Sequence, residues 1–304
     1  MTPTTETLSR GIDPVELHRR LCRLNAERFE PRLPEADWRQ DLVNFIETAP
    51  LEADYLEGER QATFSSLRNL PQDADGFIAW FEELKLSGPG QGDPLFPWLA
   101  EHAELGEMKW FLTQEIAGEA GFEDLTALTQ IRMPALPKLE LTRNYWDEMG
   151  RGRAGGMHGP MLAVLARSLG LRPKIETTVW ESLSLANTMA GLAANRRYAY
   201  QSIGALGVIE LTAPERAAAV SRGLKRLGVV AEDRRYFDLH AVLDVKHSHT
   251  WNANVLHPLE REQPETARAI AEGALMRLEA GRRCFERYRS EFGLRFDGQK
   301  ARAH

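Results

Sequence analysis

The chain has 304 residues, which is enough for one large domain or two small ones with a full apolar core. Its formal net charge of -6 argues against a general nucleic-acid-binding protein, which would usually carry a basic balance or a basic stripe. The only cysteines, Cys22 and Cys284, stand at opposite ends of the chain without the spacing of metal ligands. A disulfide framework, a structural zinc site and an iron–sulfur cluster are therefore not expected.

The start of the chain carries no recognisable targeting signal. Residues 1–11 are polar and rich in threonine, and they lack the apolar core of a signal peptide. No stretch reaches the roughly 18 consecutive apolar residues that a membrane-spanning helix needs. We therefore expect a cytoplasmic protein without a membrane partner or a nucleic-acid partner.

Helical periodicity dominates the chain from the start. Apolar residues recur at three- and four-residue spacing and strand-like alternation is nearly absent, so the sequence predicts an all-α fold. Asp13 and Pro14 form a typical helix start, with the aspartate as N-cap and the proline in the first turn. The clearest break is the glycine- and proline-rich segment 87–94. The helices predicted before this break cover residues 13–29, 35–48, 51–68 and 74–86.

After the break the same periodicity predicts a helical bundle whose side chains project into a shared interior. Its helices are expected at residues 95–119, 122–131, 137–150, 157–169, 175–194, 198–211, 214–227, 233–256 and 263–291. Pro214 is expected to begin a new helix. We interpret residues 1–90 as an N-terminal helical arm packed on the core, and residues 91–304 as the main domain.

The segment from residue 236 to 251 is the most informative for function. His240, Asp244 and His247 stand at i, i+4 and i+7, so they share one face of a helix, whereas His249 points elsewhere. Chance histidines on a polar helix face would be the plainer interpretation. Four of the eight histidines nevertheless fall between residues 240 and 257, within an otherwise apolar helix. This favours a metal site.

A second candidate region joins Glu148 to His158. The glycine-rich stretch between them allows the chain to bend while both side chains turn inward. A phosphate-binding loop is the other interpretation of such glycines, but no strand precedes them and their spacing matches neither phosphate-loop fingerprint. Taken alone, Glu148 would also fit a solvated charge on a helix.

Two further carboxylates complete the set of candidate ligands. Glu115 follows an apolar run and has Glu119, one turn later, as its competitor. Glu210 ends the apolar run from residue 203, although exposure at a helix end would also explain it. A carboxylate in such a run is costly to bury unless it is paired or coordinated. Carboxylate and imidazole ligands without thiolates suit non-haem iron or manganese rather than structural zinc.

These motifs resemble the haem-oxygenase-like di-iron oxidases and oxygenases, a family of iron-containing redox enzymes. The resemblance covers roughly residues 95–255 and depends on four motifs. They are Phe-Leu-x-x-Glu115, Asn-Tyr-x-Asp-Glu148 with its following glycines and His158, Gly-x-x-Glu210, and His240-x3-Asp244-x2-His247.

The resemblance implies a haem-oxygenase-like helical fold, two Fe2+ ions per chain and O2 as co-substrate. It implies six iron ligands, with His240 as an additional histidine present in only some members of the family. The six are Glu115, Glu148, His158, Glu210, Asp244 and His247. A small-molecule substrate and an external electron donor are implied as partners, and the size of the chain with its helical arm suggests a homodimer.

Family members differ in the reaction that they catalyse. Some N-oxygenate amines, guanidines or amino-heterocycles, and others cleave carbon–carbon bonds of fatty acids or amino acids. The additional His240 resembles the N-oxygenating members, so we expect N-oxygenation of an amine or amino-heterocycle in a biosynthetic pathway. The alternatives are an oxidative lyase or desaturase and, from another class, a metal-free helical binding protein.

Several other side chains have two interpretations. Haem binding is not expected, because His18 is the only early histidine and its arginine neighbours predict an exposed position. Arg151 and Arg153 could clamp a substrate carboxylate, but solvated loop charges are the favoured interpretation. Tyr200, Phe237 and Trp251 could line a pocket, although ordinary core positions are favoured.

Overall fold

The computed structural model describes residues 11–34, 37–118 and 121–294. Over these ranges the chain forms α-helices joined by short turns and 3-10 segments, with no strand, which confirms the predicted all-α class. The first helix begins as predicted, because the Asp13 side chain accepts hydrogen bonds from the backbone N–H groups of Val15 and Glu16.

The helices follow one another with short connections. In the first half they are α1 (Pro14–Phe29), α2 (Trp38–Ala62), α3 (Ala74–Ser87), α4 (Leu95–Glu101), α5 (Leu105–Gly118), α6 (Phe122–Thr129) and α7 (Ala135–Glu148). In the second half they are α8 (His158–Leu169), α9 (Trp180–Ala194), α10 (Ala199–Arg226), α11 (Arg235–Trp251), α12 (His257–Glu262) and α13 (Ala267–Glu291). A π-helical segment, Asn252–Leu256, joins α11 to α12.

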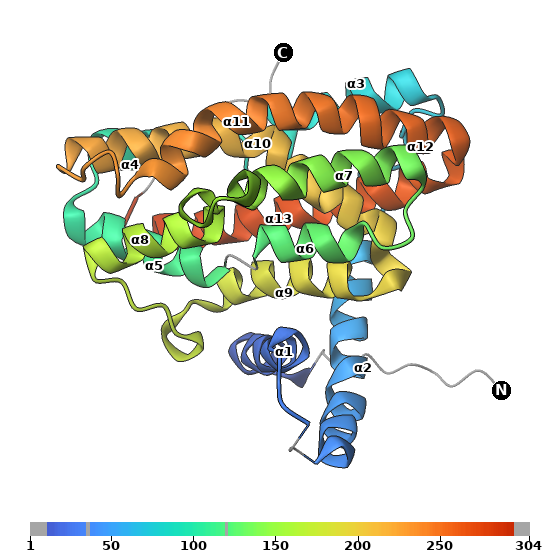
Figure 1. The fold of residues 1–304 in the computed structure, drawn as a ribbon, viewed down its shortest axis with the longest axis horizontal. Helices are drawn as coiled ribbons and strands as arrows, with labels where there is room; N and C mark the ends of the chain where they lie inside the picture. The colour runs from blue at the N-terminus through green and yellow to red at the C-terminus, as the bar shows by residue number, and fades with distance from the viewer. Residues whose placement is uncertain (1–10, 35–36, 119–120, 295–304) are drawn as a thin grey trace.

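Most helices of the body run along the long axis of the molecule, whereas α1 and α2 lie below α9 on one side (Figure 1). One cluster of buried apolar side chains nevertheless includes Leu17 of α1, Leu56 of α2 and Tyr288 of α13. Helix α3 packs against α10 and α12 and so belongs with the body. The predicted division at residue 90 stays a prediction.

Helix α10 is central, because it packs against α4, α9, α11 and α13. Its contact with α13 depends on two glycines. A Cβ atom on Gly204 would lie 1.8 Å from the carbonyl oxygen of Ile270, and one on Gly273 would lie 1.8 Å from that of Gln201. The two backbones therefore touch at a distance that other residues do not allow.

Substitution of Gly204 by alanine is expected to lower the free energy of unfolding by about 3 kcal/mol or more, since a methyl group cannot fit against the α13 backbone. The matched control is Gly58→Ala in α2, where nothing lies within 4 Å and the change should add about 0.5–1 kcal/mol. Urea denaturation of both variants measures the difference. Equal stabilities would contradict the close packing of α10 and α13.

Several predicted helix boundaries are wrong. Helix α2 continues through Pro50, and α10 continues through Pro214, where the sequence predicted breaks. Each proline removes one backbone hydrogen bond, but packing along both halves of α10 outweighs that loss. Conversely, the helix predicted at 95–119 is divided into α4 and α5. Its final residue, Glu119, lies outside the described residues.

His18 is buried, contrary to the prediction of an exposed position. It lies on the inner face of α1, between the rings of Tyr55 and Trp180, and Asn187 donates a hydrogen bond to its backbone carbonyl. Burial lowers the pKa of His18 to about 4, so this imidazole is neutral in the folded protein at pH 7. Its role is in packing.

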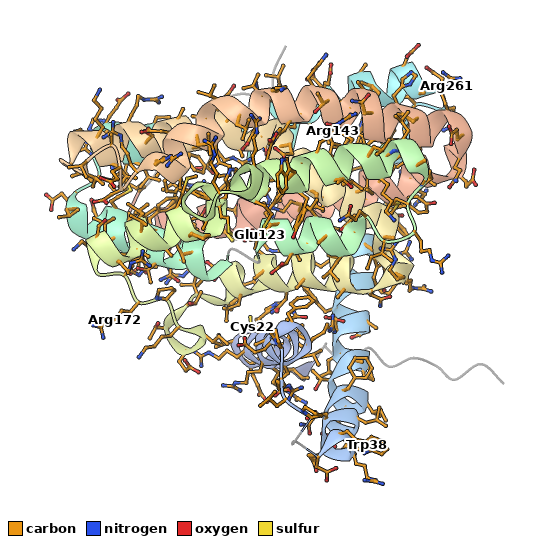
Figure 2. The ribbon with its side chains drawn as sticks, viewed as in Figure 1. Cys22, Trp38, Glu123, Arg143, Arg172 and Arg261 are labelled. Carbon is orange, nitrogen blue, oxygen red and sulfur yellow. The ribbon has the colours of Figure 1, made fainter. Side chains whose placement is uncertain are left out.

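Some apolar surface remains uncovered in the described chain. Trp38 lies at the end of α2 farthest from the body (Figure 2), and it is 62% exposed. Further exposed apolar side chains on this half of α2 are Leu42, Val43, Phe45 and Ile46. No described helix is both long enough and apolar enough to cross a membrane.

Candidate metal centre

Six of the seven predicted ligands meet in the interior of the body. They come from the end of α7, the start of α8, the middle of α10 and one face of α11. The six are Glu148, His158, Glu210, His240, Asp244 and His247. All are buried except His240, which is half-buried, and His249 is exposed as predicted.

The turn between α7 and α8 brings Glu148 next to His158. It is formed by two 3-10 segments, Gly150–Gly152 and Ala154–Gly156, that fold back on each other. Gly150 has a φ of 60°, and a Cβ atom there would lie 2.2 Å from the backbone of Gly156. Only glycine permits this closure, so the glycine-rich stretch serves as the inward bend that the sequence predicted.

The ligand atoms form two groups that share one carboxylate. Glu148, His158 and His240 make the first group, in which the ligand atoms lie within 4.8 Å of one another. Glu148, Glu210 and His247 make the second, under the same limit. Glu148 therefore stands between two adjacent sites that could each hold a metal ion.

Distances within the cluster are short. The Nδ1 atom of His158 lies 2.6 Å from Oε2 of Glu148. The Nδ1 atom of His247 lies 3.4 Å from Oε2 of Glu210 and 3.9 Å from Oδ1 of Asp244. Asp244 thus adds a third carboxylate beside Glu148 and Glu210.

Neighbouring groups fix the orientation of the two histidines on α11. Nδ1 of His240 lies 2.7 Å from the backbone carbonyl of Tyr236, and Nε2 of His247 lies 3.1 Å from the Asp147 carboxylate. A carbonyl or carboxylate oxygen can only accept, so these nitrogens carry the protons. The remaining nitrogens, Nε2 of His240 and Nδ1 of His247, face away from these partners and are the atoms available for metal ligation.

The amide of Asn144 orients Glu210 in the same way. Its Nδ2 atom donates a 2.5 Å hydrogen bond to Oε1 of Glu210, which leaves Oε2 turned toward His247. Asn144 and Asp147 belong to the Asn-Tyr-x-Asp-Glu148 motif. The sequence motif therefore carries both a ligand and the groups that orient its neighbours.

The pKa values of three side chains in the cluster are raised above their ordinary values. Burial and the nearby Glu210 charge raise the pKa of Glu148 to about 9, and burial with the same carboxylate raises that of Asp244. Burial alone would lower the pKa of His247, but the carboxylates of Glu210 and Asp147 raise it to about 9. Without a cation, the cluster holds protons at pH 7 to balance its negative charge.

The other two histidines are neutral. Burial and the proximity of His247 lower the pKa of His158 to about 4, and burial with the proximity of His158 has the same effect on His240. Their rings lie 4.6 Å apart between centroids. Neutral imidazoles are the form that coordinates a metal.

The donor set fits a pair of metal ions. Oδ1 of Asp244 is buried without a hydrogen bond among the described residues, and the buried Nδ1 atoms of His158 and His247 contact carboxylates of the cluster. A buried polar atom without a hydrogen bond is costly unless something satisfies it. Two cations, one in each ligand group, would offset the carboxylate charge and give Asp244 a partner, and imidazole with carboxylate ligands suits iron or manganese.

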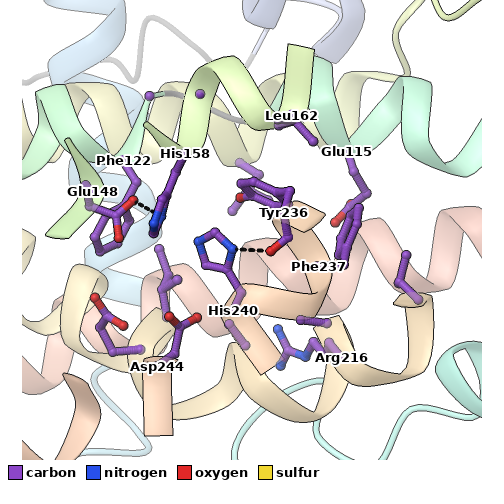
Figure 3. Close-up of a pocket in the computed structure, with 18 of the residues that line it drawn as sticks. Glu115, Phe122, Glu148, His158, Leu162, Arg216, Tyr236, Phe237, His240 and Asp244 are labelled. Atoms are coloured by element: carbon purple, nitrogen blue, oxygen red, sulfur yellow. Dashed lines mark hydrogen bonds and ion pairs between the residues drawn. The ribbon is translucent and has the colours of Figure 1, made fainter. Parts of the chain in front are cut away.

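Glu115 does not join this cluster. It faces the same cavity, but Figure 3 shows it at the end opposite Glu148, and Oε1 accepts a 2.8 Å hydrogen bond from the Tyr288 hydroxyl. Burial raises its pKa. Its predicted role as a ligand stays a prediction without a described contact to the other six residues.

Glu123 is the carboxylate that the sequence interpretation missed. It lines the cavity from the first turn of α6, and Oε1 lies 2.9 Å from where a Cβ atom on Gly159 would be. Its charge acts on both Glu148 and His158. An acid in the first turn of a helix is ordinary, because it complements the helix dipole, so its position carried no signal.

A cavity of about 210 Å³ adjoins the cluster (Figure 3). Glu148, His158 and Asp244 line it near one end, and Phe122, Leu162 and Phe237 form apolar wall. Phe237 is thus a pocket residue.

The other side chains with two interpretations do not line the cavity. Tyr200 donates a hydrogen bond to Gln263, and Trp251 is fully buried in the core. Arg151 and Arg153 are exposed, and Arg151 pairs with Asp147.

Fold and site together define an all-helical protein with a buried cluster of carboxylates and imidazoles beside a pocket. The model of a family described as "iron-containing redox enzyme" matches residues 109–282, which is more than half of the chain. The chain therefore belongs to this family of iron-containing redox enzymes, as the motifs predicted.

The chain is also similar to solved structures. Two structures of a CADD-like protein of unknown function from Nostoc punctiforme PCC 73102 have TM-scores of 0.56 and 0.54 at 17% identity. They cover 72% of this chain and 97% and 95% of the other. A domain of unknown function with a haem oxygenase-like fold from Shewanella denitrificans OS217 has a TM-score of 0.49 at 16% identity, covering 75% and 95%.

The predicted haem-oxygenase-like fold class is confirmed by the family and the helical architecture together. The similarity to the solved structures concerns the fold alone. A comparison with curated proteins finds no match.

Proposed function

We propose that this protein is a non-haem di-iron enzyme that uses O2 to oxidise a small molecule. The observation that carries the proposal is the shared position of Glu148, which belongs to both ligand groups. A carboxylate in that position can bridge two metal ions, and helical bundles commonly hold such carboxylate-bridged pairs. Iron is the metal that membership of the family favours.

The ligands of the two iron ions would come from different residues, with Glu148 shared. His158 and His240 with Glu148 would hold one ion, and His247, Glu210 and the shared Glu148 would hold the other, with Asp244 beside them. The bound iron pair would supply the electrons that reduce O2, and an external donor would restore them. The carboxylates offset the charge of the cations, and the neutral imidazoles fix the geometry.

The enzyme must also exclude bulk water from the cluster and orient its substrate, and the cavity wall can do both. Phe122, Leu162 and Phe237 make the space beside the cluster apolar. An apolar wall excludes bulk water, and it holds a substrate with one end directed at the cluster.

N-oxygenation of an amine or amino-heterocycle is the reaction that we favour. The cavity is small, and carboxylates line its end beside the cluster, which suits a substrate nitrogen directed there. The proximity of His240 to His158 supports the same choice. A metal-free binding protein would be expected to have Glu148 and Glu210 exposed and apart, whereas they are 3% and 2% exposed in one ligand group.

Matched variants test which carboxylate completes the site. Glu123→Ala is expected to lower metal affinity at least about tenfold, because Glu123 faces Glu148 and His158, whereas Glu115→Gln should leave iron binding unchanged. Anaerobic Fe(II) titration with metal analysis measures both. The reverse result, with iron lost only in Glu115→Gln, would restore Glu115 as the ligand and remove Glu123 from the site.

A homodimer formed through α2 is our proposal for the quaternary structure. Several large apolar side chains are exposed on its first half, and such a concentration often marks an interface. Sedimentation velocity is expected to give about twice the chain mass of 34.3 kDa, and Ile46→Glu should shift the protein to the monomer. A monomeric wild type would contradict the proposal.

A further inference from the structure

The cavity has a second polar end, away from the metal centre. Arg216 of α10 and Arg277 of α13 line it there together with Glu115 of α5. Figure 3 shows Arg216 and Glu115 at the end opposite Glu148, with Phe237 in the space near them. Between the two polar ends the wall is largely apolar, with Leu162 among its residues.

Arg216 is an unusual arginine. Its Nη2 atom is buried without a hydrogen bond, and no ion pair involves this side chain within the described chain. The guanidinium lies over the ring of Phe285, 4.8 Å from its centroid, and 5.7 Å from that of Phe96. Burial and the nearby charge of Arg277 lower the pKa of Arg216 to about 9. A guanidinium buried in this way is costly to the fold unless a ligand satisfies it.

Glu115 does not remove that cost. Its Oε1 atom is engaged by Tyr288, and burial raises its pKa. The Nη2 atom of Arg216 therefore keeps its unsatisfied N–H groups beside this end of the cavity. A guanidinium with free donors suits an anionic group of a ligand.

We infer that the substrate is an organic carboxylate, whose carboxylate group binds Arg216 while its oxidisable end points toward Glu148 and His158. The planar guanidinium can donate two parallel hydrogen bonds to a carboxylate, which fixes orientation as well as affinity. The apolar wall between the two ends would hold a hydrocarbon spacer. The direction of the oxidisable end rests on the proposed function, whereas carboxylate binding at Arg216 does not.

Carboxylates and their amides, measured on the metal-free full-length protein, test the inference. The probes are hexanoate, 3-phenylpropionate and 6-aminohexanoate, each beside its neutral amide, with inorganic phosphate as another anion. Isothermal titration calorimetry is expected to show at least one carboxylate binding about tenfold tighter than its amide. Arg216→Met should weaken that binding about 10- to 100-fold, and Arg216→Lys should weaken it less.

The matched control is Arg222→Met on the same helix, where the side chain is exposed and binding should not change. Unliganded Arg216→Met is expected to unfold at the wild-type temperature or above, because it removes an unsatisfied buried charge. A structural role for Arg216 would instead lower that temperature in both substitutions, and this result would contradict the inference.

The inference is also overturned if no carboxylate is preferred to its amide, if Arg216→Met binds as the wild type does, or if phosphate alone binds through Arg216. Because the titrations contain no metal, they are independent of the iron site. Carboxylate binding in a protein that fails to load iron would refute the proposed function and leave the Arg216 site standing. Iron loading in a protein that does not prefer carboxylates to their amides would refute the Arg216 site and leave the proposed function standing.

Discussion

Replacement of Glu148 by alanine is expected to abolish stable binding of both iron ions, whereas replacement of His240 should cost only one. Glu148 belongs to both ligand groups, and His240 belongs only to the first. Wild-type protein should bind about two ions per chain, as carboxylate-bridged helical sites do. Anaerobic Fe(II) titration, followed by desalting and metal analysis, counts the ions that remain.

The histidine variants distinguish the loss of one iron ion from the loss of both. His240→Ala and His247→Ala should each retain about one ion, because each removes a ligand from a different group. His249→Ala is the control, since His249 lies exposed on the same helix and should leave the iron content at the wild-type value. Full iron content in Glu148→Ala would refute the shared-carboxylate arrangement.

Metal binding is expected to become tighter as pH rises from about 6 to 9, by about tenfold per pH unit for each proton that the metal displaces. Glu148 and His247 have pKa values raised to about 9, and the pKa of Asp244 is also raised. All three carry protons at pH 7 in the metal-free protein, so a cation must displace them. Below pH 7 these protons compete strongly, and above about pH 9 the advantage of a further rise is lost.

Titrations in buffers of different ionisation enthalpy count the released protons directly. His158 and His240 should contribute none near pH 7, because their pKa values are lowered to about 4. Asp147→Asn should reduce the count by up to about one, since Asp147 helps to keep His247 protonated. An affinity that does not change with pH would mean that the cluster is unprotonated or that metal binds elsewhere.

Much of the site was predictable because its signal is local in the sequence. His240, Asp244 and His247 share a face through helical spacing alone, and Glu148 and His158 are linked by a turn whose glycines stand out. The buried position of Glu210 was predicted as one of two alternatives, and packing of α10 on its neighbours decides between them.

The remaining features depend on tertiary contacts. The sequence interpretation named Glu115 and missed Glu123, because an acid in an apolar run stands out more than one in a first helical turn. The structure separates them by their partners, which are Tyr288 for Glu115 and the Glu148–His158 pair for Glu123. Likewise, nothing in the spacing of residues predicted that α10 would continue through Pro214.

The burial of Arg216 also depends on tertiary contacts that the sequence does not show. In the sequence it is one arginine of a charged helix end, next to Glu215 and Pro214. Its burial between Phe96 and Phe285 follows from the meeting of α4, α10 and α13, which no local pattern specifies. The sequence interpretation considered a carboxylate clamp at Arg151 and Arg153 and favoured solvated loop charges there, and both side chains are exposed.

The reaction of the iron-loaded protein with O2 tests the central claim most directly. Full-length protein is loaded anaerobically with Fe(II), desalted, analysed for metal and mixed with O2 in a stopped-flow spectrometer. We predict about two irons per chain and a transient visible absorption that forms and decays after mixing. One iron or none, with no transient absorption, would contradict the assignment of this cluster as an O2-activating di-iron site.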